Sequence, residues 1–223
     1  MKLSLLSAAA CAALASVAFC ASDAAADGGR QVAADVGQWR VIERESGPTN
    51  YYVVVHDGAG SYLRGYFRAG METTVLGWQT PDNVRASAQT LRWRWRVEAF
   101  PKDADECASG RTDSPAVVYA TWKRGLKWYT IKYVWSTVGG KGNVCDKHRN
   151  PFSAQDTVIL ESGGAADQWR TEEVDLKSEF RRHFEDGHMD ADVPDFVGIG
   201  IMSDGDQTHS DSAADYGSFS IDW

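Results

Sequence analysis

Hydrophobic and polar residues alternate with a period of two along most of this chain. The clearest case is Leu91–Val97, where Leu91, Trp93, Trp95 and Val97 share one side and three arginines share the other. Because successive side chains of a strand point to opposite faces, this segment is predicted to be a strand with one buried face. The same pattern predicts further strands at Trp39–Glu43, Tyr51–His56, Tyr62–Arg68, Ala116–Trp122, Tyr129–Trp135, Thr157–Glu161, Gln168–Val174, Val197–Met202 and Tyr216–Trp223.

One helix is expected after the strand that ends near Val174. Leu176, Phe180 and Phe184 recur every four residues, Asp175 is in the position of an N-cap, and Gly187 marks the end. Many short strands with a single short helix favour an all-β fold, a two-sheet β-sandwich.

The first 26 residues have the composition of an export signal. Lys2 supplies the positive charge, Leu3–Phe19 is apolar or small, and Ala24–Ala26 offers a cleavage site before Asp27. We therefore expect a signal peptide over residues 1–26 and one β-sandwich domain over residues 27–223. The mature protein is then periplasmic or secreted and has no transmembrane anchor.

The cysteines add two predictions about compartment and covalent structure. Lipoprotein anchoring through Cys20 is the alternative to soluble export, although the bulky Phe19 before it does not suit lipoprotein processing. In the mature chain Cys107 and Cys145 are the remaining pair, and an oxidising compartment favours a disulfide between them. A metal site built on these two cysteines is the other possibility, with His148 nearby.

Composition narrows the class of partner. The formal net charge is −8, which argues against a nucleic-acid partner because phosphate binding needs a basic surface. The nine tryptophans are spread along the chain, mostly on predicted strands, and core packing is their default role. A few aromatic residues remain for use at the surface.

An acidic loop follows the strand Val197–Met202 and is the densest group of chemically capable side chains. Asp204, Asp206 and Thr208 offer hard oxygen ligands, and the spacing of two lets the carboxylates of Asp204 and Asp206 converge on one Ca²⁺ ion. The predicted ligand-binding set is Asp113, Asp204, Asp206 and Thr208, with a possible structural Ca²⁺ on Asp204 and Asp206. A solvated acidic turn is the alternative interpretation, since the loop lacks the ligand order of an EF-hand.

A catalytic role for this loop would need a partner from elsewhere in the chain. Two carboxylates on one loop are too close to flank a sugar from both sides, so Asp204 or Asp206 would require Asp113, Glu161 or Glu72. His209 is the best histidine for proton transfer. The other histidines are interpreted as turn or surface residues: His56, His148, His183 and His188.

The arginines of the strand Leu91–Val97 form a basic row. Arg92, Arg94 and Arg96 could bind an acidic glycan through bidentate contacts, or could pair with acids on neighbouring strands. The excess of acidic residues favours pairing.

Several segments together resemble a bacterial family known as domain of unknown function 3047. They are Asp113-Ser114-Pro115, TIKYVW (Thr130–Trp135), ESG (Glu161–Gly163), Trp169 and the terminal GIGIMSDGDQT. The chain departs from the family pattern at Val117, where members carry Arg, and at Thr112, where Asp is common. The resemblance implies an exported jelly-roll-like domain, similar in architecture to carbohydrate-binding modules, and supplies no reaction.

Three functions follow as hypotheses. The leading one is binding of a polysaccharide or other envelope component without cleavage. The second is an envelope-glycan hydrolase or lyase that uses Asp204 or Asp206 with a distant carboxylate or His209. The third is a structural partner in the cell envelope.

Overall fold

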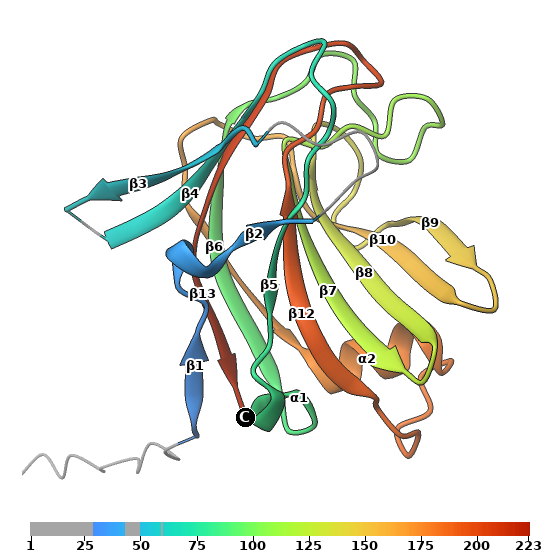
Figure 1. Ribbon diagram of the computed structural model, residues 1–223. Helices are drawn as coiled ribbons and strands as arrows, with labels where there is room; N and C mark the ends of the chain where they lie inside the picture. Colours follow the sequence, from blue (N-terminus) through green and yellow to red (C-terminus); the bar gives the residue numbers. More distant parts are fainter. Residues whose placement is uncertain (1–28, 43–49, 59) are drawn as a thin grey trace, which may run out of the picture.

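Two β-sheets pack face to face in the computed structural model, which describes residues 29–42, 50–58 and 60–223 (Figure 1). The predicted signal peptide, Cys20 and the end of the strand predicted at Trp39–Glu43 lie outside the described residues. In the part of the chain that is described, no helix combines the length and the apolar character needed to cross a membrane.

The first sheet, sheet A, is antiparallel throughout. Its strand order is β11-β6-β13-β4-β3, and β1 pairs with the end of β13. The strands are β1 (Gln31–Ala33), β3 (Tyr52–Asp57), β4 (Gly60–Phe67), β6 (Thr90–Ala99), β11 (Arg170–Asp175) and β13 (Ser212–Asp222).

The second sheet, sheet B, carries the candidate sites described below. Its order is β2-β5-β12-β7-β8-β10-β9, with antiparallel pairing except between β8 and β10, which are parallel. The strands are β2 (Arg40–Val41), β5 (Leu76–Gln79), β7 (Ala116–Arg124), β8 (Lys127–Ser136), β9 (Val144–Arg149), β10 (Ser153–Ser162) and β12 (Asp195–Met202).

The predicted helix is confirmed as α2 (Leu176–Phe184), which lies behind β7 and β8 in Figure 1. The Asp175 carboxylate accepts a hydrogen bond from the backbone N of Ser178 at 2.7 Å and caps the first turn. Phe180 packs edge-on against Tyr129 and also contacts Trp122. The helix therefore seals one end of the space between the sheets. Two shorter helices, η1 (Val36–Gln38) and α1 (Asp82–Arg85), connect strands.

The two-sheet β-sandwich is confirmed, and the core lies between the sheets. Trp93 and Trp95 point inward from β6 and are almost fully buried, as their alternation with arginines predicted. Six of the nine tryptophans are buried, which confirms core packing as their main role. They are Trp39, Trp78, Trp93, Trp95, Trp122 and Trp135.

His183, interpreted from sequence as a turn or surface residue, is in fact buried. Its side chain is 5 % exposed, and its Nδ1 lies 2.8 Å from Oδ2 of the fully buried Asp156 on β10. The residue lies on the face of α2 that turns toward the sheet, where the carboxylate satisfies its ring nitrogen. The prediction failed because Asp156 and His183 are far apart in sequence.

The outer face of sheet B is buried at one end of its strands and exposed at the other. At the end where β7 begins, four register partners on neighbouring strands form a second, smaller hydrophobic cluster; they are Met202, Val117, Val134 and Ile159. Cys145 packs on this cluster and is disulfide-bonded to Cys107, which confirms the predicted disulfide.

The disulfide fastens the loop of residues 100–115 to this end of sheet B. Glu106 of the loop accepts a hydrogen bond from Lys132 Nζ at 2.7 Å, and Lys132 projects from the outer face of β8. Ser114 Oγ donates to the other oxygen of Glu106 at 2.6 Å. This end of the face is therefore covered, whereas the opposite end is open.

Candidate functional site

Asp113, Asp204 and Asp206 come together at one rim of the sandwich. Asp204 follows β12 and Asp113 precedes β7, and these strands are antiparallel neighbours, so the end of one meets the start of the other. One carboxylate oxygen from each residue lies within 4.8 Å of the others. The loop and the distant carboxylate that the sequence singled out therefore form one cluster.

Asp113 serves the fold of this loop. Its Oδ2 accepts hydrogen bonds from the backbone N and from Oγ1 of Thr208, at 2.7 and 2.6 Å, and its Oδ1 accepts from Gln207 N at 3.2 Å. The Asp113 side chain is fully buried. Three donors from one loop thus converge on a carboxylate that precedes β7.

Asp204 is the other buried carboxylate of the cluster. Its Oδ1 accepts from Thr73 Oγ1 at 2.7 Å and from Gly205 N at 2.8 Å. Burial raises the pKa of Asp204 to about 6; the Thr73 hydrogen bond opposes this rise, and the charges of Asp206 and Asp113 add to it. Asp204 consequently exchanges a proton in a range where ordinary aspartates are fully ionised.

His209 lies beside this cluster rather than in it. It is exposed, has a φ of +51°, and lines a small depression of about 530 Å³ with Lys102 and Asp103. Of the distant carboxylates considered for catalysis, Asp113 joins the cluster, whereas Glu161 pairs with Lys141 at 2.5 Å.

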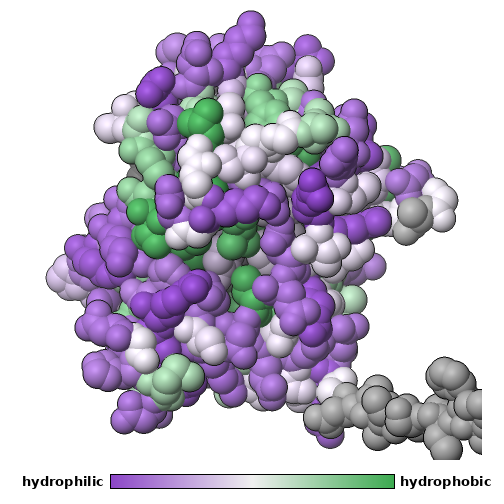
Figure 2. Space-filling model, turned by 180° about the vertical axis from the view of Figure 1, so that it is seen from behind, coloured by the Kyte–Doolittle hydropathy of each residue, from purple (hydrophilic) through white to green (hydrophobic). Residues whose placement is uncertain are grey.

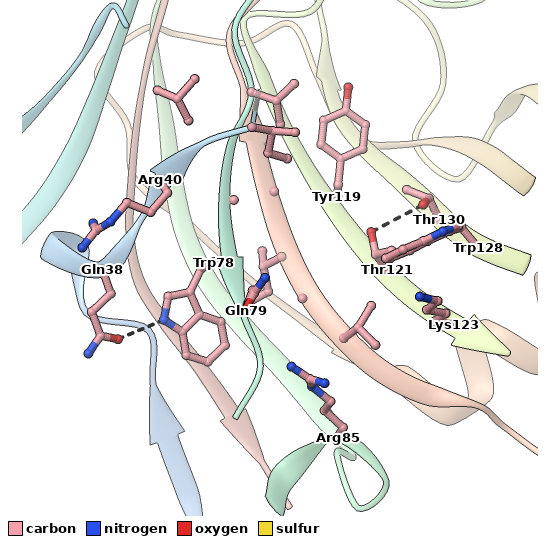
Figure 3. Close-up of a pocket in the computed structure, with 18 of the residues that line it drawn as sticks. Gln38, Arg40, Trp78, Gln79, Arg85, Tyr119, Thr121, Lys123, Trp128 and Thr130 are labelled. Atoms are coloured by element: carbon pink, nitrogen blue, oxygen red, sulfur yellow. Dashed lines mark hydrogen bonds between the residues drawn. The ribbon is translucent and has the colours of Figure 1, made fainter. Parts of the chain in front are cut away.

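A large hollow lies on the open end of the outer face of sheet B (Figure 3). This groove has a volume of about 1060 Å³ and crosses β2, β5, β12, β7, β8 and β10. It is lined by Gln38, Arg40, Val41, Ile42, Val75, Gly77, Trp78, Gln79, Arg85, Tyr119, Thr121, Lys123, Trp128, Thr130, Gln155, Val197, Gly198, Ile199 and Gly200.

Glycines on β5 and β12 form part of the groove floor. A Cβ at Gly200 would lie 3.1 Å from Cδ2 of Tyr119, and one at Gly77 would lie 3.2 Å from Cδ1 of Ile42. Because Gly200 and Gly77 have no side chains, the side chains of Tyr119 and Ile42 can pack directly over the backbone of these glycines. No side chain of Gly77 or Gly200 fills the groove at these positions.

One wall of the groove carries an exposed aromatic platform. Trp128 on β8 is 44 % exposed, and Lys123, its cross-strand partner on β7, holds Nζ 4.5 Å from the centroid of the indole ring. Next to them Thr121 and Thr130 face each other with their hydroxyl oxygens 3.4 Å apart. Figure 3 shows these four side chains on the same side of the groove.

The opposite wall comes from the N-terminal part of the described chain and from α1. The indole nitrogen of Trp78 donates to Gln38 Oε1 at 3.0 Å, and the Arg40 guanidinium donates to Gly37 O and Trp39 O, both at 2.8 Å. Arg85 donates from Nε to Thr80 O at 2.9 Å. These bonds hold two cations in place at this wall.

The groove residues were not identified from sequence. Most of them come from six strands, several of which are neighbours in space but distant in the chain, and β5, with its glycine, was not predicted as a strand. The sequence did contain an indication that Trp128 is exposed. The buried side chains of β8 are at alternate positions, Tyr129, Ile131, Tyr133 and Trp135, so the side chain of Trp128 points to the opposite, outer face.

The arginine row on β6 mainly pairs with acids of neighbouring strands, as predicted. Arg92 pairs with Glu173 at 2.7 Å and with Asp222, and Arg96 pairs with the buried Asp215 at 2.7 Å. Arg94 instead stacks on Trp169, 4.4 Å from the ring centroid.

On the side of the molecule opposite to the view of Figure 1, the surface is mostly hydrophilic (Figure 2).

Comparison with solved structures returns carbohydrate-binding modules and glucanases at low similarity. A family 11 carbohydrate-binding module from Clostridium thermocellum has 9 % identity and a TM-score of 0.44, over 86 % of this chain and 94 % of that one. A xylan-binding module, CBM15, has 14 % identity and a TM-score of 0.39, over 87 % and 97 %. An endo-1,4-β-glucanase has 12 % identity and a TM-score of 0.45, over 84 % and 94 %.

Sequence comparison gives a more specific result. No curated protein sequence is significantly similar to this chain. The model of the family described as "Protein of unknown function (DUF3047)" matches residues 37–220, which include both sheets almost completely. The resemblance seen in the strand and rim motifs is thereby confirmed, and this chain belongs to the DUF3047 family.

Proposed function

We propose that this protein binds a polysaccharide or a related envelope component in the groove of sheet B, and that it does so without cleaving it. The observation that carries the proposal is the composition of the groove. An exposed indole and several hydrogen-bonding side chains, among them Thr121, Thr130 and Gln155, line the groove. Apolar surface with a few placed polar groups is typical of small-molecule and glycan sites.

The chemistry of the lining favours binding over hydrolysis. Glycoside hydrolases use two carboxyl groups that flank the scissile bond, one of which donates a proton. The described residues that line the groove include no aspartate or glutamate. The rim carboxylates lie apart from this lining, and Asp113 and Asp204 are buried by the hydrogen bonds of their own loop.

Affinity electrophoresis through gels that contain soluble polysaccharides tests the proposal, with calorimetry on any polymer that retards the protein. The key variant is Trp128→Ala, which removes the exposed platform and leaves the core intact. We expect it to weaken binding by about tenfold or more, equivalent to about 1.4 kcal/mol.

Trp169→Ala is the matched control. It makes the same change on sheet A, where Trp169 stacks on Arg94 and Arg96, away from the groove. Binding should survive this substitution. Equal losses in both variants, or no retardation by any polymer of a broad panel, would overturn the proposal.

A hydrolase or lyase that uses Asp204 or Asp206 is the second candidate. Its support is the pKa of Asp204 near 6, which suits a general acid, with Asp206 exposed beside it. Incubation with the same polymers followed by analysis of released oligosaccharides distinguishes the two functions. Product release that Asp206→Asn abolishes would establish the enzyme, and we expect no release.

We also propose that the protein acts outside the cytoplasm, in the periplasm or as a secreted protein. The Cys107–Cys145 disulfide supports this location, since such bonds persist in oxidising compartments. N-terminal sequencing of the exported protein should begin at or close to Asp27. A lipid-modified N-terminus at Cys20 would instead establish the lipoprotein alternative.

A further inference from the structure

We propose that the groove selects an acidic polysaccharide, one that carries uronic acid residues, whose carboxylates meet Lys123, Arg40 and Arg85. This inference rests on the proposed function and specifies its ligand class. Its basis is the charge of the lining: three cations and, among the described lining residues, no carboxylate. The whole chain carries a net charge of −8, so this local excess of positive charge opposes the overall trend.

Lys123 and Trp128 form the centre of the proposed site. The Lys123 ammonium lies 4.5 Å from the centroid of the exposed indole. Because the ammonium covers one face of the indole, a sugar ring that stacks on this face would displace it, and the flexible lysine side chain would keep the ammonium within reach of a uronate carboxylate. A neutral sugar would use the indole equally well but would gain little from the charge.

Lys123 differs in this respect from the other lysine on the same face. Lys132, four register positions further along the β7–β8 pair, is buried and paired with Glu106 at 2.7 Å. The structure describes no ion pair for Lys123 among the residues it covers, and its contact is with the aromatic ring. Asp195 is its register partner on β12, but no ion pair joins the two in the described structure, so the Lys123 charge is available to a ligand.

The two arginines of the opposite wall extend the positive strip across the groove. Arg40 Nη1 donates hydrogen bonds to the backbone oxygens of Gly37 and Trp39, which fix the position of the guanidinium. Arg85 pairs with Asp82 at 2.9 Å, but the Asp82 side chain is 89 % exposed, so solvent screens this pair strongly. Figure 3 shows Arg40 on the side of the groove opposite Lys123 and Trp128, and Arg85 at the lower end of the groove. Cations on both walls fit a polymer with repeated negative charge rather than a single terminal acid.

A matched pair of polymers tests the inference: polygalacturonate, and the same polymer after reduction of its carboxyl groups. We expect polygalacturonate to bind at least about tenfold more tightly than the reduced polymer. The preference should shrink when NaCl rises from about 50 to about 500 mM, because salt screens exposed charges. Equal affinity for both polymers would overturn the inference.

Two lysine variants locate the charge effect. Lys123→Gln should reduce affinity for polygalacturonate by a much larger factor than affinity for the reduced polymer. Lys147→Gln removes the same charge from β9, outside the groove, and should have no effect on either. Equal effects of the two substitutions would contradict the site.

The outcomes separate this inference from the proposed function. If neutral polymers bind with a dependence on Trp128 and charge has no influence, the binding function stands and the acidic ligand is wrong. If no polymer binds at all, both are wrong.

Discussion

Asp113 and Thr208 are joined by two hydrogen bonds to a single oxygen: the backbone N and the hydroxyl of Thr208 both donate to Asp113 Oδ2, at 2.7 and 2.6 Å. The two residues are 95 positions apart in sequence. This contact ties the acidic loop after β12 to the start of β7, and it explains why the rim loop has a defined shape.

Asp113→Ala should therefore destabilise the protein. The substitution leaves the Thr208 donors and the Gln207 amide without their acceptor at a fully buried position, which is expected to lower the free energy of unfolding by about 2–4 kcal/mol. Urea denaturation measures this change. Asp206→Ala is the control, since Asp206 is exposed and its loss should change stability by less than about 0.5 kcal/mol. Equal losses for both would contradict the role assigned to Asp113.

Asp204 should make stability depend on pH. Its pKa is raised from 3.8 to about 6, so the folded state holds this proton more tightly than the unfolded state. The free energy of unfolding should then fall as pH rises from about 4 to 6, by up to about 3 kcal/mol, and stay low above that range. Denaturation midpoints measured across this range report the effect.

Asp204→Asn should remove most of this dependence. An amide oxygen can still accept from Thr73 and Gly205, while the amide carries no charge to repel Asp206. The variant should be more stable than the parent protein at pH 7.5 and similar to it near pH 4. A variant that is less stable at pH 7.5 would show that the ionised form is required.

Calcium binding by Asp204 and Asp206 stays a prediction, and the same carboxylates allow a direct test. A bound divalent cation would relieve the repulsion within the cluster and raise the melting temperature at pH 7.5. Asp204→Asn should abolish the increment, and Mg²⁺, which prefers a smaller, stricter octahedron, should give less. An unchanged melting temperature in millimolar CaCl₂ would contradict the prediction.

The disulfide should contribute substantially to stability. Cys107 and Cys145 are 38 residues apart, and closing a loop of that length restricts the unfolded chain by about 4 kcal/mol in the chain-entropy model. The double variant Cys107→Ser/Cys145→Ser should lose a similar amount in urea denaturation. Limited proteolysis should also cut the variant faster within residues 100–115. Unchanged cleavage there would mean that the Glu106–Lys132 pair alone holds the loop.

The alternation of side chains predicted most of the fold because it reports local geometry. Leu91–Val97 and the helix at Leu176–Phe184 were located well, since their periodicity is strong and the burial of each face follows from it. β5 and β9 were missed: β5 contains Gly77, and β9 is a polar edge strand with little buried surface.

The sites were predicted unevenly for a related reason. The acidic loop is contiguous in sequence, so its carboxylates were identified, and the antiparallel pairing of β12 and β7 brings Asp113 to it. The groove depends on the order of strands in sheet B, where β5, β12 and β7 become neighbours from distant parts of the chain. No local pattern encodes that order.

The covered and open ends of sheet B have a consequence for how the protein could diversify. The loop of residues 100–115 covers the face as far as Lys132, and the groove begins at Tyr119, the register partner of Lys132 on β7. If the groove binds a polysaccharide as proposed, a longer or shorter loop would change how many sugar units the open face accommodates, while the strands stay as they are. Under the same proposal, the lining side chains Lys123, Trp128 and Thr130 would determine which sugars bind. Ligand length and ligand chemistry can thus be varied independently, by insertion in one segment and substitution in another.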